Sequence, residues 1–198
     1  MIQDDVRELE LIKRFGLKKD PEAGRSDTDA LLKHKGKNIP FELKSTTRGS
    51  ITTVRDFGPD HIRKWKNKHW LIGVYNKEAK LRYCLYGSPS DMKPWIDEKR
   101  KYIQPDFKLA RHIPALITLK TLYAVMGKKT VYTLEDARNL QKKQFAAVQY
   151  KNLMDLKTGY TPNRMLKILT ARCKYVIERG ATLNNPHIPE SYCKLPVT

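Results

Sequence analysis

The feature that most constrains the fold is a run of seven residues, His69 to Tyr75 (HWLIGVY), that is apolar almost throughout. A run of this length is too short to cross a membrane, and it is typical of a strand buried on both faces of a sheet. A second apolar run, Lys80 to Tyr86 (KLRYCLY), follows after a short polar segment that can turn the chain. The two runs therefore predict neighbouring strands in a sheet.

The sequence around these two runs predicts further strands and helices. Ile39 to Ser45 (IPFELKS) alternates between apolar and polar residues, which indicates a strand with one polar face. Arg164 to Arg179 has apolar residues at helical spacing, and Thr161 and Pro162 ahead of it are typical of a helix start. The other expected elements are a helix at Asp4 to Phe15, loop and hairpin at 20–38, a short basic helix at His61 to Lys68, a mixed region with prolines at 87–106, and a helix from Leu134 to about Asp155 that Thr133 caps.

This order of elements predicts an α+β fold, a mixed α/β arrangement in which helices flank a core sheet. The length of 198 residues fits a single domain. Within that domain we expect a core at 1–106 and a mainly helical elaboration at 107–198, which ends in a loop rich in turn-forming residues.

The charge of the chain indicates its class of partner. Lysine and arginine number 39 against 21 aspartates and glutamates, so the formal net charge is +18. Such an excess favours a polyanionic partner, nucleic acid first and an anionic membrane surface second. Because the basic residues are spread along the chain, we expect a folded basic surface rather than a disordered basic tail.

Membrane and secretory signals are missing from the sequence pattern. No apolar run approaches the roughly 20 residues of a membrane span, and the segment MIQDDVRELE does not follow a signal-peptide pattern. The three cysteines, Cys84, Cys173 and Cys193, form no closely spaced pair, so we expect neither a zinc site nor a disulfide framework. We therefore expect a cytoplasmic protein with reduced thiols and no membrane partner.

Two acidic residues and a lysine form the pattern with the clearest chemistry. Glu42 and Lys44 lie two apart in the strand FELKS, so their side chains share one face, and Asp29 on a neighbouring strand or hairpin can reach that face. Carboxylates bind a hard divalent cation, and an ammonium group beside them can orient or deprotonate a water or stabilise an anionic transition state. The pattern predicts phosphodiester hydrolysis. Asp27 remains an alternative metal ligand, and an ordinary polar strand face remains the alternative explanation of the motif.

The same motif and several matches around it resemble the type II restriction endonucleases of the PD-(D/E)xK superfamily. The similarity covers about half of the chain and keeps one order along it. It runs through Gly24-Arg25, Asp29-Ala30, Glu42 to Ser45, Arg48-Gly49, Pro59, Ile62, Lys64, Trp70 to Tyr75 and Asn184 to Pro189.

The resemblance implies an activity, a cofactor and a partner. Asp29 and Glu42 would bind Mg²⁺, and Lys44 would be the catalytic lysine. The substrate would be double-stranded DNA, cut in both strands at a short specific sequence to leave 5′-phosphate and 3′-hydroxyl ends. A palindromic site would be matched by a homodimer, because two-fold symmetric DNA fits a two-fold symmetric protein. In this view 1–198 is a nuclease domain belonging to a prokaryotic restriction system.

The resemblance further implies that residues 52–56 enter the major groove and that Asn184 and Asn185 contact DNA. Within 52–56, Arg55 can bind guanine through two hydrogen bonds, and Asp56 can accept one from the cytosine amino group. A surface ion pair is the alternative for these two residues. Thr52 and Thr53 are weaker candidates for base contacts, and ordinary strand residues are the alternative for them.

A basic segment and a long helical stretch complete the candidate DNA contacts. Arg63 and Lys64, with Lys66 and Lys68, are expected to contact phosphates, although a solvated basic face would have the same composition. The stretch at 107–180 has no counterpart in the resemblance, so its role stays open.

Two other functions remain open at this point. A structure-specific nuclease, such as a junction resolvase or a repair enzyme, would share the catalytic motif. A basic nucleic-acid-binding protein without catalysis would share only the charge.

Overall fold

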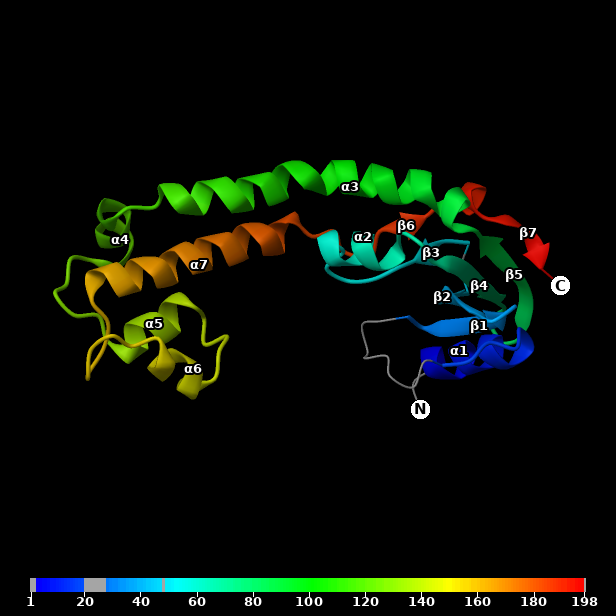
Figure 1. Ribbon diagram of the computed structural model, residues 1–198, viewed down its shortest axis with the longest axis horizontal. Coiled ribbons are helices and arrows are strands. Elements are labelled where there is room, and N and C mark those ends of the chain that lie inside the picture. Colours follow the sequence, from blue (N-terminus) through cyan, green and yellow to red (C-terminus); the bar gives the residue numbers. More distant parts are fainter. Residues whose placement is uncertain (1–2, 20–27, 48, 198) are drawn as a thin grey trace. The chain divides into compact units, whose positions relative to one another are not determined.

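The computed structural model of the protein describes residues 3–19, 28–47 and 49–197 (Figure 1). Gly24, Arg25, Asp27 and Arg48, which belong to the motifs above, lie outside these ranges. The chain divides into two compact units. Unit 1 comprises 1–103 and 182–198, and unit 2 comprises 104–181.

Unit 1 is built on a five-stranded mixed sheet with the strand order β1-β2-β4-β5-β7. The strands are β1 (Ala30–His34), β2 (Lys37–Thr46), β4 (His69–Tyr75), β5 (Leu81–Gly87) and β7 (Lys194–Val197). β2 and β4 are parallel, and the other neighbours are antiparallel. The two apolar runs therefore form adjacent strands as predicted, and the α+β class is confirmed.

Helices cover both faces of this sheet (Figure 1). α1 (Gln3–Arg14) packs on one face, where Leu11 meets Leu43 and Leu71 in a buried apolar cluster. On the opposite face, α2 (Pro59–Trp65) and the beginning of α3 (Pro89–His112) contribute to a cluster of aromatic rings. Its members are Phe57, Trp65, Trp70 and Trp95. Adjacent residues of β4 serve opposite faces, which is the alternation a strand imposes.

A short two-stranded ribbon in unit 1 joins segments that are far apart in the sequence. β3 (Ile51–Thr52) pairs antiparallel with β6 (His187–Ile188). The indole nitrogen of Trp95 donates a hydrogen bond to the backbone oxygen of His187 at 2.9 Å, so α3 is bonded directly to the ribbon. A 3₁₀ turn, η2 (Glu190–Tyr192), then leads to β7.

Unit 2 is helical and has its own core. It contains the 3₁₀ turn η1 (Ile113–Leu116) and the helices α4 (Leu119–Met126), α5 (Leu134–Leu140), α6 (Ala147–Asn152) and α7 (Pro162–Ala181). Its core is rich in tyrosine and comprises Leu122, Tyr132, Ala137, Tyr150, Tyr160, Met165, Ile168 and Leu169. Thr133 caps α5 as predicted, since its hydroxyl accepts from the Asp136 amide and the Asp136 carboxylate accepts from the Thr133 amide. α7 matches the predicted helix and extends it to Ala181.

The mixed region expected at 87–106 is instead part of the long helix α3. Pro89 occupies the helix start, which suits a residue without an amide proton, but Pro94 and Pro105 lie inside the helix. An interior proline costs about 3 kcal/mol, whereas one fully buried large apolar side chain contributes about 1.5–3 kcal/mol. Several such side chains are buried along α3, namely Met92, Trp95, Ile96 and Ile103. Their packing therefore outweighs the two prolines.

The single helix expected from Leu134 to about Asp155 is two short helices, α5 and α6. Lys142 and Lys143 both have φ of 55°, in the left-handed region that no α-helix tolerates. Gln141 just before them is buried, and its side-chain amide donates to the Ile168 backbone oxygen at 3.5 Å. A contact with α7 thus ends α5, and no local pattern in the sequence indicates this break.

Candidate active site

The predicted catalytic residues Asp29, Glu42 and Lys44 lie together in unit 1. Glu42 and Lys44 project from the same face of β2, and the Lys44 ammonium is 2.8 Å from Glu42 Oε1. Asp29 lies directly before β1, and its Oδ2 is 4.0 Å from the same ammonium. The structure therefore brings together three residues that the sequence only suggests are neighbours.

The position of Asp29 follows from the pairing of β1 with β2. Ala30 is opposite Phe41 in this hairpin, so the next pair outward would match Asp29 with Glu42. At this point the Leu43 amide donates to Asp29 Oδ2 at 2.8 Å. The carboxylate thus extends the hydrogen-bond ladder by one step, and it is held against the strand that carries Glu42 and Lys44.

Two further lysines converge on the same carboxylates. Lys64 Nζ is 3.8 Å from Asp29 Oδ1 and 3.6 Å from Glu42 Oε2, and Lys68 Nζ is 3.2 Å from Glu42 Oε2. The sequence analysis assigned both lysines to phosphate contacts and placed neither beside the carboxylates. Lys64 lies on α2 and Lys68 in the segment between α2 and β4, so no helical spacing indicates that they meet.

Burial makes this cluster an electrostatic unit. Glu42 is only 1% exposed, and an ion at such a position requires compensating charges. Its burial acts to raise its pKa, but the ammonium groups of Lys44 and Lys64 and then Lys68 outweigh that, so the pKa of Glu42 is lowered. The pKa of Asp29 is raised, first by burial and then by the neighbouring Glu42 charge, despite the lysines. Two carboxylates in similar surroundings thus have opposite shifts.

A cleft of about 280 Å³ opens beside the cluster. Asp29 and Lys44 line it together with Thr52 and Thr53 of the predicted recognition segment. Glu8 of α1 also lines it and forms an ion pair with Lys19 at 3.1 Å. The sequence analysis missed Glu8, since nothing local distinguishes it from the other acidic residues of a polar helix.

The carboxylates of Asp29, which lines the cleft, and of Glu42 beside it are compatible with Mg²⁺. Two carboxylates supply hard oxygen ligands, and Mg²⁺ in proteins is commonly held by one or two carboxylates together with water and substrate phosphate. Within the described parts of the chain, no group of three or more histidine, cysteine, aspartate or glutamate side chains is arranged to hold a metal. A Mg²⁺ ion held by Asp29 and Glu42 would take its remaining ligands from water and substrate.

The predicted DNA-contacting segments at 52–56 and 184–185 lie side by side. Beyond the β3–β6 pair, the Asn185 amide donates to the Val54 backbone oxygen at 2.9 Å, and Phe57 and Leu183 exchange two backbone hydrogen bonds. Thr53 Oγ1 donates to the Pro186 backbone oxygen at 2.8 Å, so Thr53 also has a structural role. The segments thus form one irregular ribbon, although over 120 residues separate them.

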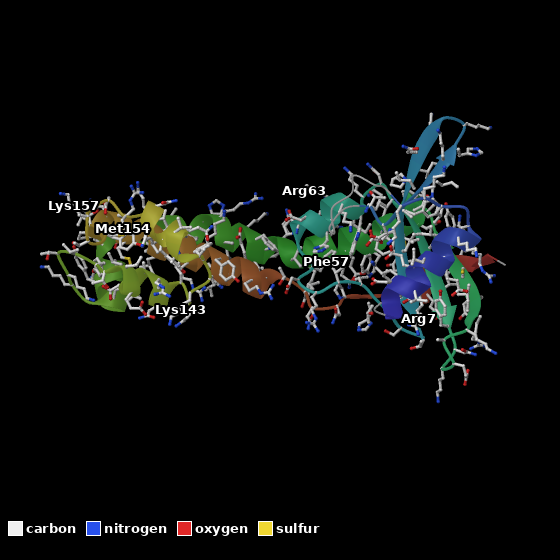
Figure 2. The ribbon with its side chains drawn as sticks, turned by 90° about the horizontal axis from the view of Figure 1, so that it is seen from below. Arg7, Phe57, Arg63, Lys143, Met154 and Lys157 are labelled. Carbon is white, nitrogen blue, oxygen red and sulfur yellow. The ribbon has the colours of Figure 1, made fainter. Side chains whose placement is uncertain are left out.

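Exposure sorts the residues of this ribbon and of α2. Arg55, Asp56, Thr52 and Asn184 are exposed, whereas Thr53 and Asn185 are half-buried. Arg63 is 77% exposed on α2, where it pairs with Asp60, and Figure 2 locates it beside the segment that contains Phe57. Arg63 and Lys64 were predicted as a pair, yet only Lys64 reaches the carboxylates.

Comparisons with known proteins do not identify the chain: no family model matches it, and no curated protein is significantly similar to it. Among the described residues, no helix is both long enough and apolar enough to span a membrane.

Proposed function

We propose that this protein is a type II restriction endonuclease, a Mg²⁺-dependent enzyme that hydrolyses double-stranded DNA at a short specific sequence. The observation that carries the proposal is that Asp29, from just before β1, lies against Glu42 and Lys44 of β2, beside a cleft that Asp29 and Lys44 line. An ordinary polar strand face would explain Glu42 and Lys44 but not an aspartate hydrogen-bonded into the same ladder. It would also not explain a carboxylate buried among three lysines.

Asp29 and Glu42 are the residues that would hold the metal. When bound, Mg²⁺ neutralises charge on the scissile phosphate and lowers the pKa of attacking water. Glu42 is suited to this role because the surrounding lysines keep it ionised despite its burial. Asp29 is suited because the Leu43 amide fixes one of its oxygens in place.

Lys44 would act as a cation and hydrogen-bond donor rather than as a base. Burial acts to lower its pKa, but Glu42 and Asp29 outweigh this, so the pKa of Lys44 is raised. The side chain therefore stays an ammonium group, which can orient the attacking water and stabilise negative charge that develops on the phosphate.

Lys64 and Lys68 would position Glu42 and compensate its charge in the absence of metal. Lys64 is 20% exposed and can turn toward a phosphate, whereas Lys68 is 6% exposed and stays with Glu42. By this difference in exposure, Lys64 would contact a phosphate and Lys68 would be structural.

The irregular ribbon supplies the proposed sequence reading. A two-stranded ribbon fits the major groove, and Arg55 is the exposed side chain in it that can bind guanine through two hydrogen bonds. Thr52, Asp56 and Asn184 are further exposed candidates. A palindromic recognition site would be bound by a homodimer, with one cleft for each strand.

The test is digestion of a sequenced phage genome by the full chain in Mg²⁺. The expected result is a set of discrete fragments whose ends share one short sequence. Glu42→Gln should abolish cutting, while Asp60→Asn, a similar change at an exposed carboxylate of α2, should leave it intact. Cutting confined to branched DNA would indicate a structure-specific nuclease, and binding without any cutting would contradict the nuclease proposal.

A further inference from the structure

Unit 2 carries a large excess of positive charge. Residues 104–181 contain 15 lysines and arginines and only five aspartates and glutamates. The proposed active site and the irregular ribbon both belong to unit 1, so neither accounts for this charge. Excess charge that is not used in folding indicates a partner of opposite sign.

The basic residues of α7 are largely engaged within the unit. Arg164 lies 4.0 Å from Asp155, Arg172 donates to Gln144 at 2.8 Å, and Lys174 lies 3.7 Å from Glu178. Lys129 bonds to Asp136, next to the cap of α5. The unpartnered basic charge of unit 2 therefore lies mainly outside α7.

The segment around α6 differs, because its lysines point to solvent without a charged partner. We call Lys142, Lys143, Lys151 and Lys157 the lysine surface. All four are exposed, and within the described chain none of them forms an ion pair or a side-chain hydrogen bond. Lys143 and Lys157 come from the segments before and after α6 (Figure 2). From 142 to 153, every residue except Tyr150 is exposed.

Buried residues nevertheless anchor this exposed segment to the core of unit 2. Tyr150 is fully buried, its hydroxyl accepts from the Phe145 amide at 3.3 Å, and its backbone oxygen accepts from the Tyr160 hydroxyl at 2.7 Å. The buried Gln141 anchors the other end through Ile168. One side chain of α6 thus enters the core and the rest of the helix is held outward.

The backbone of the turn before α6 is strained. Lys142 and Lys143 are consecutive non-glycine residues with positive φ, a conformation that is unfavourable for side chains such as lysine. Glycine or asparagine would fit these positions better, so stability alone does not account for two lysines there.

We propose that the lysine surface is a second DNA-binding surface, which grips the phosphates of double-stranded DNA and presents α6 to the major groove. Phosphate contacts by lysine supply most of the affinity and fix the position of a protein on DNA. The major groove is about 12 Å wide and admits a helix. Val148 and Asn152, four residues apart and both exposed, share one face of α6.

Charge favours DNA over a second copy of the chain as the occupant. Exposed apolar residues, including Phe145 and Val148, lie near the lysines and could in principle pack against another protein. Two copies would bring together surfaces of the same strong positive charge, which is repulsive. A DNA duplex removes that repulsion and releases counterions when it binds.

The test measures the affinity of the full chain for a short duplex in Ca²⁺, across a range of salt concentrations. One variant carries Lys142→Ala, Lys143→Ala, Lys151→Ala and Lys157→Ala. The matched control removes the same charge from exposed positions in the two β-hairpins of unit 1, through Lys33→Ala, Lys37→Ala, Lys77→Ala and Lys80→Ala. Each phosphate contact contributes about 0.9 to the slope of log K against log salt. The first variant should lose about 3 to 4 of that slope, and the control much less.

Several outcomes would overturn the proposal. These are an equal loss in both variants, no loss in either, or a loss of single-strand affinity alone. A changed sedimentation coefficient with unchanged DNA affinity would identify a self-association surface instead. The proposal is independent of cleavage: if the wild type cuts no DNA but the lysine variant loses duplex affinity, the nuclease assignment fails and this surface stands. If the wild type cuts and the variant binds normally, only this surface fails.

Discussion

The two units use charge in opposite ways. In unit 1, the buried Glu42 is surrounded by lysines, and its nearest ammonium is 2.8 Å away. In unit 2, the lysines around α6 are exposed and have no charged partner within the described chain. Charge is thus buried and compensated around Glu42, and exposed and uncompensated around α6.

This difference suits the charges around Glu42 to catalysis and the exposed lysines around α6 to attracting a polyanion. A buried ion is retained only where partners compensate its desolvation, and the resulting geometry is fixed before any substrate arrives. An exposed ammonium is screened by salt within about 10 Å at moderate ionic strength, so it acts mainly on a dense polyanion. Removing charges around Glu42 should therefore alter rate and stability, whereas removing the exposed lysines around α6 should alter affinity and its salt dependence.

The largest expected effect is that of Glu42→Gln. Cutting should fall below detection, and the free energy of unfolding should drop by about 3 kcal/mol, because three lysines lose their buried counter-charge. Plasmid cleavage in Mg²⁺ and urea unfolding measure the two effects, with Asp60→Asn as the control. Full activity in Glu42→Gln would show that the buried charge around Glu42 is not needed for cutting.

Lys44→Ala should lower the single-turnover cleavage rate by about 10²–10⁴-fold, because one electrostatic or acid–base group commonly contributes this much. DNA affinity in Ca²⁺ should change far less than the rate. Lys66→Ala is the matched control, since Lys66 is exposed on the basic segment that follows α2. A loss under about threefold would show that Lys44 is not part of the chemistry.

Lys68→Met tests whether buried charge in unit 1 is structural. Loss of its contact with Glu42 should cost about 1–3 kcal/mol in the free energy of unfolding, measured in urea. Lys66→Met should leave the free energy of unfolding within about 0.5 kcal/mol of the wild type. Equal effects of the two changes would mean that Lys68 behaves as an ordinary surface lysine.

Arg55→Ala should reduce sequence discrimination rather than overall binding. We expect a loss of about 1–3 kcal/mol at one base pair that contains guanine, because a single bidentate contact is removed. The measurement compares affinities for the recognition site and for sites altered one pair at a time, in Ca²⁺. Arg63→Ala, at an exposed position on α2, should instead weaken binding to all sites equally. If Arg55→Ala behaves in the same way, Arg55 contacts phosphate.

The smallest effect concerns the compensated charge of unit 2, the cap of α5. Burial of Asp136 acts to raise its pKa, but Lys129 and the Thr133 amide outweigh that, so the pKa is lowered from 3.8. A lowered folded-state pKa stabilises the fold above pH 3.8, and this contribution is lost as the pH falls further. Asp136→Asn should therefore cost about 1 kcal/mol at neutral pH and much less near pH 3. A cost that does not change with pH would exclude an ionic contribution.

Local patterns in the sequence determined a substantial part of this protein. The apolar runs that became β4 and β5 were predictable, because strand burial leaves a continuous apolar signal. The shared face of Glu42 and Lys44 follows from the period of a strand, and the Thr133 cap from a four-residue motif. Each of these depends on residues only a few positions apart, which is the range in which sequence patterns act.

Only the tertiary structure decided the features that join distant residues. α3 continues through Pro94 and Pro105 because packing outweighs the local cost of proline. Lys64 and Lys68 join the carboxylates because β2 and β4 are parallel neighbours, which places the segment that leads into β4 beside Glu42. The pairing of 51–57 with 183–188, and the break between α5 and α6, likewise depend on contacts across the fold. Such contacts join residues that are far apart in the sequence, and forming them costs the entropy of closing the loops between those residues. A periodic pattern within a few residues therefore does not indicate them.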